Sequence, residues 1–323
     1  MRAEFTPLED DVELQGAFHV HLNPSREFED DLIDLDFGWA AGQLDFMVLV
    51  DDGLSPERAK ALFDSKDGRL YIPAVELENG LLAVGLRRPL PPRLTADEIR
   101  SRGGIAILRA PKGAAWDAAG ADGVELYDLE ETVSRRVPDL DAWRKGIDKR
   151  QGTEVVAEFD PDVIRRWDEL NRRAPLLGVA SHSTHHGKGA RLSYEEAFPL
   201  LTVHVNARTR SREAILEALR RRDCTVFFGA MNGYGKAGLF VESTENRTEL
   251  VVAWSNALEA THHLFRDGEP VELESARMMG FGLSYAHHWI LDRPGSYRVR
   301  ADLERGGRAR PWYLSNPVRA LPR

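Results

Sequence analysis

Gly16-Ala-Phe-His-Val-His21 is the stretch from which the fold and the chemistry of this 323-residue chain are worked out. It ends the first apolar run with two histidines that are separated by one residue. Successive side chains of a strand alternate between its faces, so His19 and His21 are expected to point to one spot at the strand's end. Two neutral imidazoles there make half of a site for Zn, Mn or Fe. An edge strand that carries two exposed histidines is the alternative interpretation.

Short apolar runs alternate with helical patterns as far as residue 222. The runs that predict strands are Gly16–His21, Asp45–Val50, Leu70–Val75, Gly104–Leu108, Gly123–Tyr127, Leu177–Ala180 and Leu201–Val205. The stretches that predict helices are Pro56–Asp64, Thr95–Arg102, Asp128–Lys149, Pro161–Arg173, Tyr194–Ala197 and Ser211–Arg222. This alternation predicts parallel pairing, in a closed β/α barrel or an open doubly wound sheet. In both folds the chemistry gathers at the carboxyl ends of the strands.

The pattern changes after Cys224. Short strand candidates follow one another without helices between them, among them Ala237–Ser243, Val271–Glu274 and Ser296–Leu303. Turn signals such as Asp292-Arg293-Pro294-Gly295 separate them. This part is expected to form a small all-β sandwich. The sequence therefore predicts two domains, covering residues 1–224 and 225–323.

The composition is that of an ordinary globular chain, with 42% hydrophobic and 29% charged residues. A formal net charge of −9 argues against a general nucleic-acid binder, because phosphate binding needs basic surface. No apolar run is long enough to cross a membrane, and the first residues lack the apolar core of a secretion signal. The single cysteine, Cys224, rules out an internal disulfide and a cysteine-based zinc cluster. These features suit the cytoplasm, or an extracytoplasmic location if a signal was removed, and they leave the oligomeric state open.

Side chains that can bind a metal follow several of the predicted strands. Beyond the two histidines they are Asp51 and Asp52 after the second strand, Glu76 at the end of the third, and His182 and His185 after the sixth. Each group also has a simpler explanation: a turn or helix cap for the aspartates, a solvated carboxylate for the glutamate, and a polar loop for the histidines. Four strand ends in succession with nitrogen or oxygen ligands favour a metal centre.

The same segments resemble the PHP (polymerase and histidinol phosphatase) superfamily. The segments that carry the resemblance are Gly16–Ser25 for its His-x-His strand end, Leu49–Gly53 for Thr-Asp-His-Asn, Ile72-Pro-Ala-Val-Glu76 for Ile-Pro-Gly-x-Glu, Gly123-Val-Glu-Leu-Tyr127 for Gly-x-Glu-x-Tyr, and Gly178–His185 for Gly-x-Asp-x-His. The tail, Pro294–Val299 and Trp312–Pro317, is similar to the β-sandwich of one branch. The resemblance covers nearly the whole chain. It implies a distorted (β/α)7 barrel followed by a β-sandwich, and a two- or three-metal cluster that hydrolyses phosphate esters.

Position by position, the resemblance implies fewer metal ions than the full cluster. The family's ligands that are present here are His19, His21, Asp51, Glu76 and His185. Asp52 and Ala110 stand where the family has histidines, and Ser183 stands where it has an aspartate. The residues present are expected to hold a single divalent metal ion (Zn, Mn or Fe) through His19, His21 and Glu76, with help from His182 or His185.

Two classes of function stay open. The first is a divergent metal-dependent hydrolase that attacks a small phosphorylated substrate with a metal-activated water. In it, Asp51 or Asp52 acts as general base or orients a histidine, and Arg109 binds a substrate anion or fills the vacant metal position. A salt-bridged barrel residue is the alternative for Arg109. The second class is a catalytically impaired relative that serves as a binding or interaction module. An amidohydrolase-type barrel is a third interpretation, but no metal-bridging lysine and no matching fourth-strand histidine is found.

Overall fold

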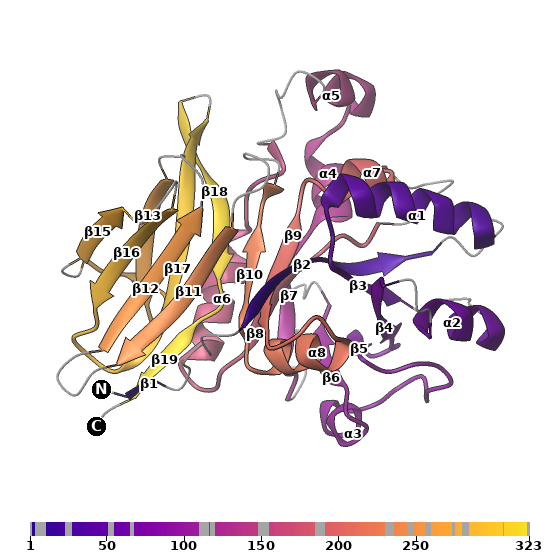
Figure 1. Ribbon diagram of the computed structural model, residues 1–323, viewed down its shortest axis with the longest axis horizontal. Coiled ribbons are helices and arrows are strands. Elements are labelled where there is room, and N and C mark those ends of the chain that lie inside the picture. Colours follow the sequence, from indigo (N-terminus) through magenta and orange to yellow (C-terminus); the bar gives the residue numbers. More distant parts are fainter. Residues whose placement is uncertain are drawn as a thin grey trace.

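The computed structural model describes most of the chain. The described residues are 2–3, 11–22, 28–50, 55–64, 68–109, 116, 120–147, 155–184, 191–229, 236–243, 248–255, 260–272, 275–279, 284–305 and 307–321. Figure 1 shows helices around the strands of the N-terminal part, and strands beside them in the C-terminal part. None of the described helices combines the length and the apolar character that a membrane crossing requires.

Strands and helices alternate as far as α8, and strands alone follow. The helices are α1 (Phe28–Gly42), α2 (Pro56–Phe63), α3 (Ala96–Ser101), α4 (Leu129–Arg136), α5 (Leu140–Ile147), α6 (Pro161–Asn171), α7 (Tyr194–Ala197) and α8 (Arg212–Arg220). The strands before residue 224 are β1 (Arg2–Ala3), β2 (Val12–His21), β3 (Phe46–Val50), β4 (Leu70–Glu76), β5 (Leu81–Val84), β6 (Ile105–Leu108), β7 (Gly123–Asp128), β8 (Leu177–Ser181) and β9 (Thr202–Ala207). Those from residue 224 onward are β10 (Cys224–Phe227), β11 (Lys236–Ser243), β12 (Thr248–Ser255), β13 (Ala260–Arg266), β14 (Glu269–Pro270), β15 (Ser275–Met279), β16 (Ser284–Ile290), β17 (Gly295–Arg305), β18 (Arg308–Ser315) and β19 (Val318–Leu321).

Local sequence fixes where several helices begin. Thr95 and Ser193 precede α3 and α7 and form capping boxes with Glu98 and Glu196. In each box the hydroxyl accepts from the third backbone N–H of the helix, and the glutamate accepts from the backbone N–H of the cap. These caps hold the starts of the short helices that follow the predicted strands.

All seven strands predicted before residue 222 are confirmed, and the fold is a mixed α/β structure. Strand β2 pairs with β3 and β3 with β4 in parallel, as do β6, β7 and β8. Parallel pairing is not complete, however. Strand β5 lies antiparallel between β4 and β6, and β9 lies antiparallel beside β2. Because β5 is antiparallel to both neighbours, β4 and β6 run in the same direction, and their carboxyl ends lie at the same edge of the sheet.

Alternate residues of the strands share one interior. Phe18 of β2, Val48 of β3, Ile72 of β4, Ile107 of β6 and Val179 of β8 belong to one buried cluster, and α8 adds apolar residues to it. Two backbone hydrogen bonds join the end of β8 back to β2, from His182 to Phe18 and from His21 to Thr184. The strand path therefore returns to its start, while the distorted (β/α)7 barrel stays a prediction.

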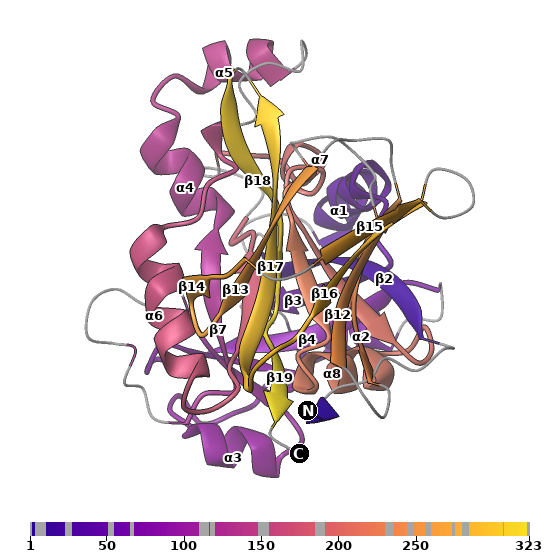
Figure 2. The same cartoon turned by 90° about the vertical axis from the view of Figure 1, so that its left-hand side faces the viewer.

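The C-terminal strands lie in two sheets. Four of them form a separate antiparallel sheet in the order β11-β12-β16-β15. The others extend the large sheet, because β18 pairs with β10, which pairs with β9. The terminal strands β1 and β19 also pair, so the two ends of the chain lie side by side (Figure 2). The β-sandwich and the domain boundary at residue 224 stay predictions.

Some elements lie outside the sequence-based expectations. Helix α1 was not predicted, since acidic residues interrupt its apolar positions. The strands that were not predicted are β1, β5, β13, β14, β15, β18 and β19. The predicted helix Asp128–Lys149 is two helices, α4 and α5, which are separated around Pro138. Residues 271 and 272 of the predicted strand Val271–Glu274 lie outside any strand, and residues 273–274 lie outside the described part of the chain.

Candidate metal centre

Two histidines of β2 meet the carboxylate that ends β4. The Nε2 atom of His19 lies 2.8 Å from Glu76 Oε1, and the Nε2 atom of His21 lies 3.7 Å from the same oxygen. One ligand atom from each of the three residues lies within 4.8 Å of the others. Both histidines are buried, whereas 24% of the Glu76 side chain is exposed. The convergence of His19, His21 and Glu76 that the sequence predicts is therefore present.

The two imidazoles converge through a distorted strand rather than a regular one. His19 has φ +60°, and the β2–β3 register shifts between Ala17 and Val20. An extra residue of this kind is a β-bulge, which re-aims a side chain. A left-handed conformation at a non-glycine residue costs about 1–3 kcal/mol and persists when its surroundings hold it there. The contacts of the His19 ring supply that restraint.

Glu125 of β7 is the main contact of the His19 ring besides Glu76. Its Oε1 atom lies 2.5 Å from His19 Nδ1, and only 2% of the residue is exposed. The β7–β8 register also shifts beside it, between Glu125 and Tyr127. Sequence reasoning did not name Glu125 as a site residue, although it noted the segment Gly123–Tyr127. A carboxylate among apolar residues of a buried strand was the available signal, because a buried charge requires a partner.

Arg109 follows β6 directly and reaches the same carboxylate. Its Nη1 atom forms an ion pair with Glu76 Oε1, and 31% of its side chain is exposed. One glutamate oxygen thus faces the His19 ring, the His21 ring and a guanidinium. Three strands, β2, β4 and β7, and the residue after β6 contribute to this cluster.

The charges in the cluster shift each other's protonation. Burial lowers the pKa of His19, but the charges and hydrogen bonds of Glu125 and Glu76 outweigh it and raise the pKa from 6.5 to about 10. Burial raises the pKa of Glu76, but the hydrogen bond from His19 and the charges of His19 and Arg109 lower it to about 2. Without a metal ion, His19 is therefore an imidazolium that donates to Glu125 and to Glu76.

His182 is not in the group of three converging residues, because both of its ring nitrogens have backbone partners. Its Nε2 atom is 2.9 Å from the carbonyl oxygen of Leu201, and its Nδ1 atom is 3.3 Å from the backbone N–H nitrogen of Phe18. The side chain is fully buried, and burial lowers its pKa to about 4. The neutral ring therefore donates from Nε2 to Leu201 and accepts at Nδ1. In this arrangement His182 joins β2 to the segments after β8 and before β9.

Several predicted site residues lie outside the described residues. They are Asp51, Asp52 and His185. Ala110, which replaces a family histidine, lies outside them as well. Ser183 is described: it has φ +46°, and its hydroxyl lies 3.4 Å from that of Ser181.

The three converging residues fit a single divalent ion. Ligands of one tetrahedral zinc ion at about 2.1 Å lie about 3.4 Å from one another. The separation of 3.7 Å between His21 and Glu76 is close to this value, and that of 2.8 Å between His19 and Glu76 has to widen slightly. Glu125 at His19 Nδ1 matches the carboxylate–histidine pair that orients metal-binding imidazoles. Mixed nitrogen and oxygen ligands suit Zn, Mn or Fe.

Comparisons with known proteins show a likeness to a solved structure. No protein-family model and no curated protein sequence matches the chain. The fold is similar to the crystal structure of a two-domain protein from Bacteroides vulgatus, which is described as containing a predicted PHP-like metal-dependent phosphoesterase. The two chains share 12% identity over 98% of each, with a TM-score of 0.46. The function proposed below rests on the residues of this chain.

Proposed function

We propose that His19, His21 and Glu76 hold one divalent metal ion, and that the protein is a divergent hydrolase of the PHP type. Its substrate is a small phosphoester. The observation that carries the proposal is the convergence of two imidazole nitrogens on one carboxylate oxygen, with Glu125 behind the first imidazole. The proposal includes a distorted (β/α)7 barrel with the site at the carboxyl ends of its strands, and a β-sandwich behind it.

Each residue has a separate task in this proposal. Glu125 accepts from Nδ1 of His19 and so keeps the Nε2 lone pair directed at the ion. A bound divalent ion would activate a water and neutralise charge on the phosphoryl oxygens. Arg109 is paired with Glu76 and is partly exposed, so it binds the substrate phosphate after releasing Glu76. One of the two aspartates that follow β3 in the sequence, Asp51 or Asp52, takes the proton from the attacking water.

A second candidate function has an observation of its own. Arg109 and the imidazolium of His19 together compensate the charges of Glu76 and Glu125. A catalytically impaired relative that binds no metal needs the same charge compensation, because unpaired buried charges would destabilise its fold. In that case the protein is a binding or interaction module, and the cluster is a structural salt-bridge network.

Hydrolysis of aryl phosphates separates the two functions. The purified protein is assayed with p-nitrophenyl phosphate and bis(p-nitrophenyl) phosphate in the presence of Mn²⁺ or Zn²⁺. The hydrolase proposal predicts metal-dependent release of nitrophenol that falls at least about 100-fold in His21→Ala. His263→Ala is the matched control, since 43% of the His263 side chain is exposed and it lies on β13. The hydrolase proposal is contradicted, and the binding module is favoured, if neither ion supports turnover. The same holds if the His21→Ala and His263→Ala variants hydrolyse the substrates equally fast.

The role of Glu125 gives a further prediction. Replacing Glu125 with glutamine is expected to lower the affinity for Mn²⁺ or Zn²⁺ by about 10–100-fold, because the amide no longer supplies a charge to His19 Nδ1. Isothermal titration of the metal-free protein measures this affinity. Glu195→Gln, an exposed position in the first turn of α7, is the control that leaves the affinity unchanged. Equal affinities in Glu125→Gln and in the unaltered protein contradict this role.

A further inference from the structure

Three buried rings lie in a row beside the bulge of β2. The ring of Tyr194 on α7 stacks on that of Phe198, with the ring centres 5.5 Å apart. Phe198 in turn packs edge-on against His182, which follows β8, with a separation of 5.3 Å between the ring centres. All three residues are completely buried. They are not among the three proposed metal ligands, so their contacts with β2 need another explanation.

The row meets the backbone of β2 on both sides of the bulge. Before the bulge, His182 Nδ1 accepts from the backbone N–H of Phe18 over 3.3 Å. After it, the hydroxyl of Tyr194 donates to the carbonyl oxygen of His21. The bulge therefore lies between two side-chain hydrogen bonds from residues that are 164 and 173 positions away in the chain.

Backbone hydrogen bonds join the same two segments. The N–H of His182 donates to the carbonyl of Phe18 over 2.9 Å, and the N–H of His21 donates to the carbonyl of Thr184 over 3.1 Å. Together with the two side-chain bonds, they restrain peptide groups on either side of His19. A left-handed conformation at a non-glycine residue, here φ +60°, persists when its surroundings restrain it at several points.

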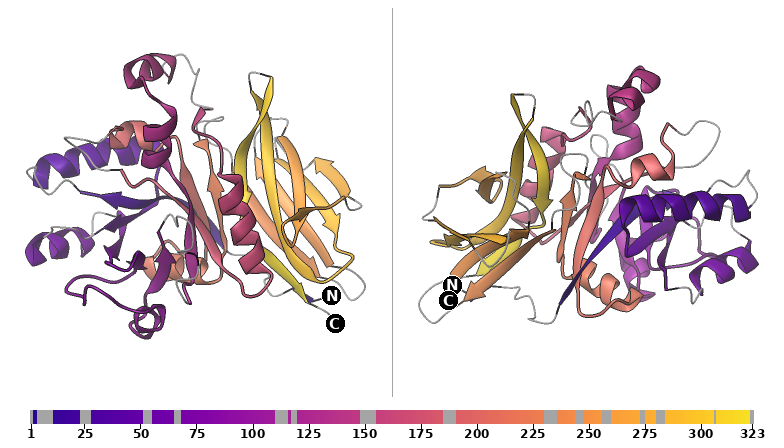
Figure 3. Two further views of the ribbon diagram at one scale, coloured as in Figure 1. Left: turned by 180° about the vertical axis from the view of Figure 1, so that it is seen from behind. Right: turned by 45° about the horizontal axis from the view of Figure 1, so that its top comes forward.

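The position of Tyr194 is set by packing away from the metal centre. Helix α7 begins with the capping box of Ser193 and Glu196, and Arg144 binds the Glu196 carboxylate through Nε and Nη2. Gly38 of α1 leaves room for the tyrosine, because a Cβ atom on it would lie 2.6 Å from Tyr194 Cβ. Figure 3 shows α7 against α1. The hydroxyl is thus held at the His21 carbonyl by contacts that do not involve the ligands.

We propose that His182 and Tyr194 are positioning residues of the metal centre. They hold the bulge of β2 in the conformation that aims His19 and His21 at Glu76, and they do so through the backbone, without contacting the ion or the substrate. Phe198 couples the two by packing against both rings. The inference deepens the proposed function and rests on it, since the geometry that it explains is that of the proposed ligands.

Replacing Tyr194 with phenylalanine tests the proposal because it removes one hydroxyl and keeps the ring. The buried carbonyl of His21 loses its donor, so the aimed conformation is less populated and the affinity for Mn²⁺ or Zn²⁺ is expected to fall about 10-fold. Isothermal titration of the metal-free protein measures the affinity. Tyr297→Phe is the matched control, because Tyr297 is equally buried and its hydroxyl donates to the carbonyl of Arg293 over 2.7 Å. Both variants lose a hydrogen bond, but only Tyr194→Phe is expected to lose metal affinity.

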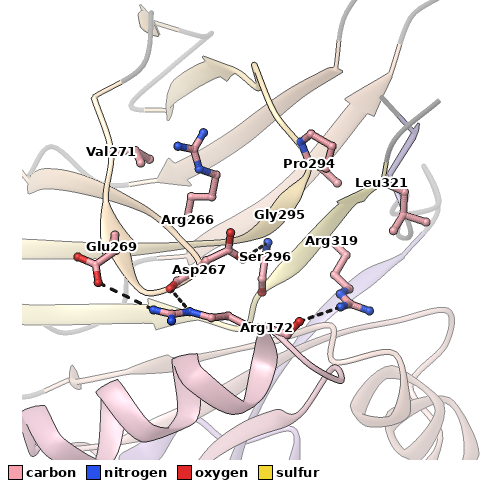
Figure 4. Close-up of a pocket in the computed structure, with 11 residues that line it drawn as sticks. Arg172, Arg266, Asp267, Glu269, Val271, Pro294, Gly295, Ser296, Arg319 and Leu321 are labelled. Carbon is pink, nitrogen blue, oxygen red and sulfur yellow. Dashed lines mark hydrogen bonds and ion pairs between the residues drawn. The ribbon is translucent and has the colours of Figure 1, made fainter.

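The control residue lies in another part of the molecule. Tyr297 follows Ser296, which lines a cavity of about 790 Å³ (Figure 4). Strands β13, β14, β17 and β19 supply most of the lining of that cavity, whereas β2, β4 and β7 supply the metal centre. A change at Tyr297 therefore reports on the loss of a buried tyrosine hydrogen bond alone.

Two variants of His182 test the other end of the row. Asparagine places an amide oxygen near the position of Nδ1 and can still accept from the N–H of Phe18, whereas leucine fills the space without an acceptor. The affinity for Mn²⁺ or Zn²⁺ is expected to be about 10-fold lower in His182→Leu than in His182→Asn. Near-UV circular dichroism verifies that each variant is folded before titration.

A proton resonance of the metal-free protein tests the positioning without an ion. The 2.5 Å contact between His19 Nδ1 and Glu125 is expected to give a strongly deshielded N–H proton in the NMR spectrum of ¹⁵N-histidine-labelled protein, identified by its loss in His19→Ala. The resonance is expected to shift or broaden in Tyr194→Phe and to stay unchanged in Tyr297→Phe. If the unaltered protein binds neither ion, the proposed function fails, while this comparison still decides the positioning role. The inference is overturned if the two tyrosine variants give the same resonance, or if they bind the metal ion equally well.

Discussion

Replacing Glu76 with glutamine is expected to weaken the binding of Mn²⁺ or Zn²⁺ by at least about 100-fold. The carboxylate is the one anionic ligand in the proposed set, and its Oε1 atom faces both imidazoles. Glutamine keeps the shape but loses the charge, and its amide leaves Arg109 without an anionic partner at this position. In the unaltered protein the bound ion also displaces Arg109 from Glu76, so the expected loss of affinity comes from the missing negative charge of the ligand.

Glu78→Gln is the matched control for this prediction. Glu78 lies two residues further along the chain, has 61% of its side chain exposed, and pairs with Arg93 at 3.2 Å. Its replacement makes the same chemical change outside the cluster and is expected to leave metal affinity unaltered. Titration calorimetry of the two metal-free variants gives the comparison. Similar affinities in Glu76→Gln and Glu78→Gln would mean that the ion binds elsewhere.

Replacing Asp168 with alanine is expected to destabilise the protein by about 3–5 kcal/mol. Asp168 and Arg298 form a bidentate pair whose side chains are 6% and 4% exposed. Removing the carboxylate leaves a guanidinium buried between α6 and β17 without its counter-charge. The cost of that unpaired charge exceeds the value of the pair itself, because both ions have already lost their hydration. Chemical denaturation with urea measures the loss.

Two further variants separate the unpaired charge from a general effect of mutating α6. Asp162→Ala alters an aspartate of the same helix with 86% exposure and is expected to change stability by less than about 1 kcal/mol. The double variant Asp168→Leu, Arg298→Met removes both charges and is expected to recover most of the loss. If the double variant is no more stable than Asp168→Ala, the unpaired charge is not the cause.

The sequence predicted the order of the N-terminal elements well because their periodicity is strong. The seven strands before residue 222 are continuous apolar runs, and each has a buried counterpart in the structure. Helix α1 was missed since its polar and apolar residues are not sorted clearly between two faces. The antiparallel position of β9 was also beyond the sequence, since pairing direction depends on where a strand returns in space.

The sequence predicted part of the candidate site. The reason for which it predicted the convergence of His19 and His21 differs from the one that the structure shows. The alternation of a regular strand predicted that His19 and His21 converge, yet they do so at a bulge with φ +60° at His19. No pattern in one strand specifies such a conformation. Glu125 was missed because its partner lies 106 residues away in the sequence. For His182, the backbone groups that engage its ring lie 164 residues away at Phe18 and 19 residues away at Leu201.

The most direct test of the account is a crystal of the protein soaked in Zn²⁺ or Mn²⁺, with anomalous scattering recorded at the metal's absorption edge. The account predicts one anomalous peak about 2.0–2.3 Å from His19 Nε2, His21 Nε2 and the Glu76 carboxylate. Glu125 stays on His19 Nδ1, and Arg109 moves off Glu76. A saturated crystal without a peak there, with Arg109 still paired to Glu76, would contradict it.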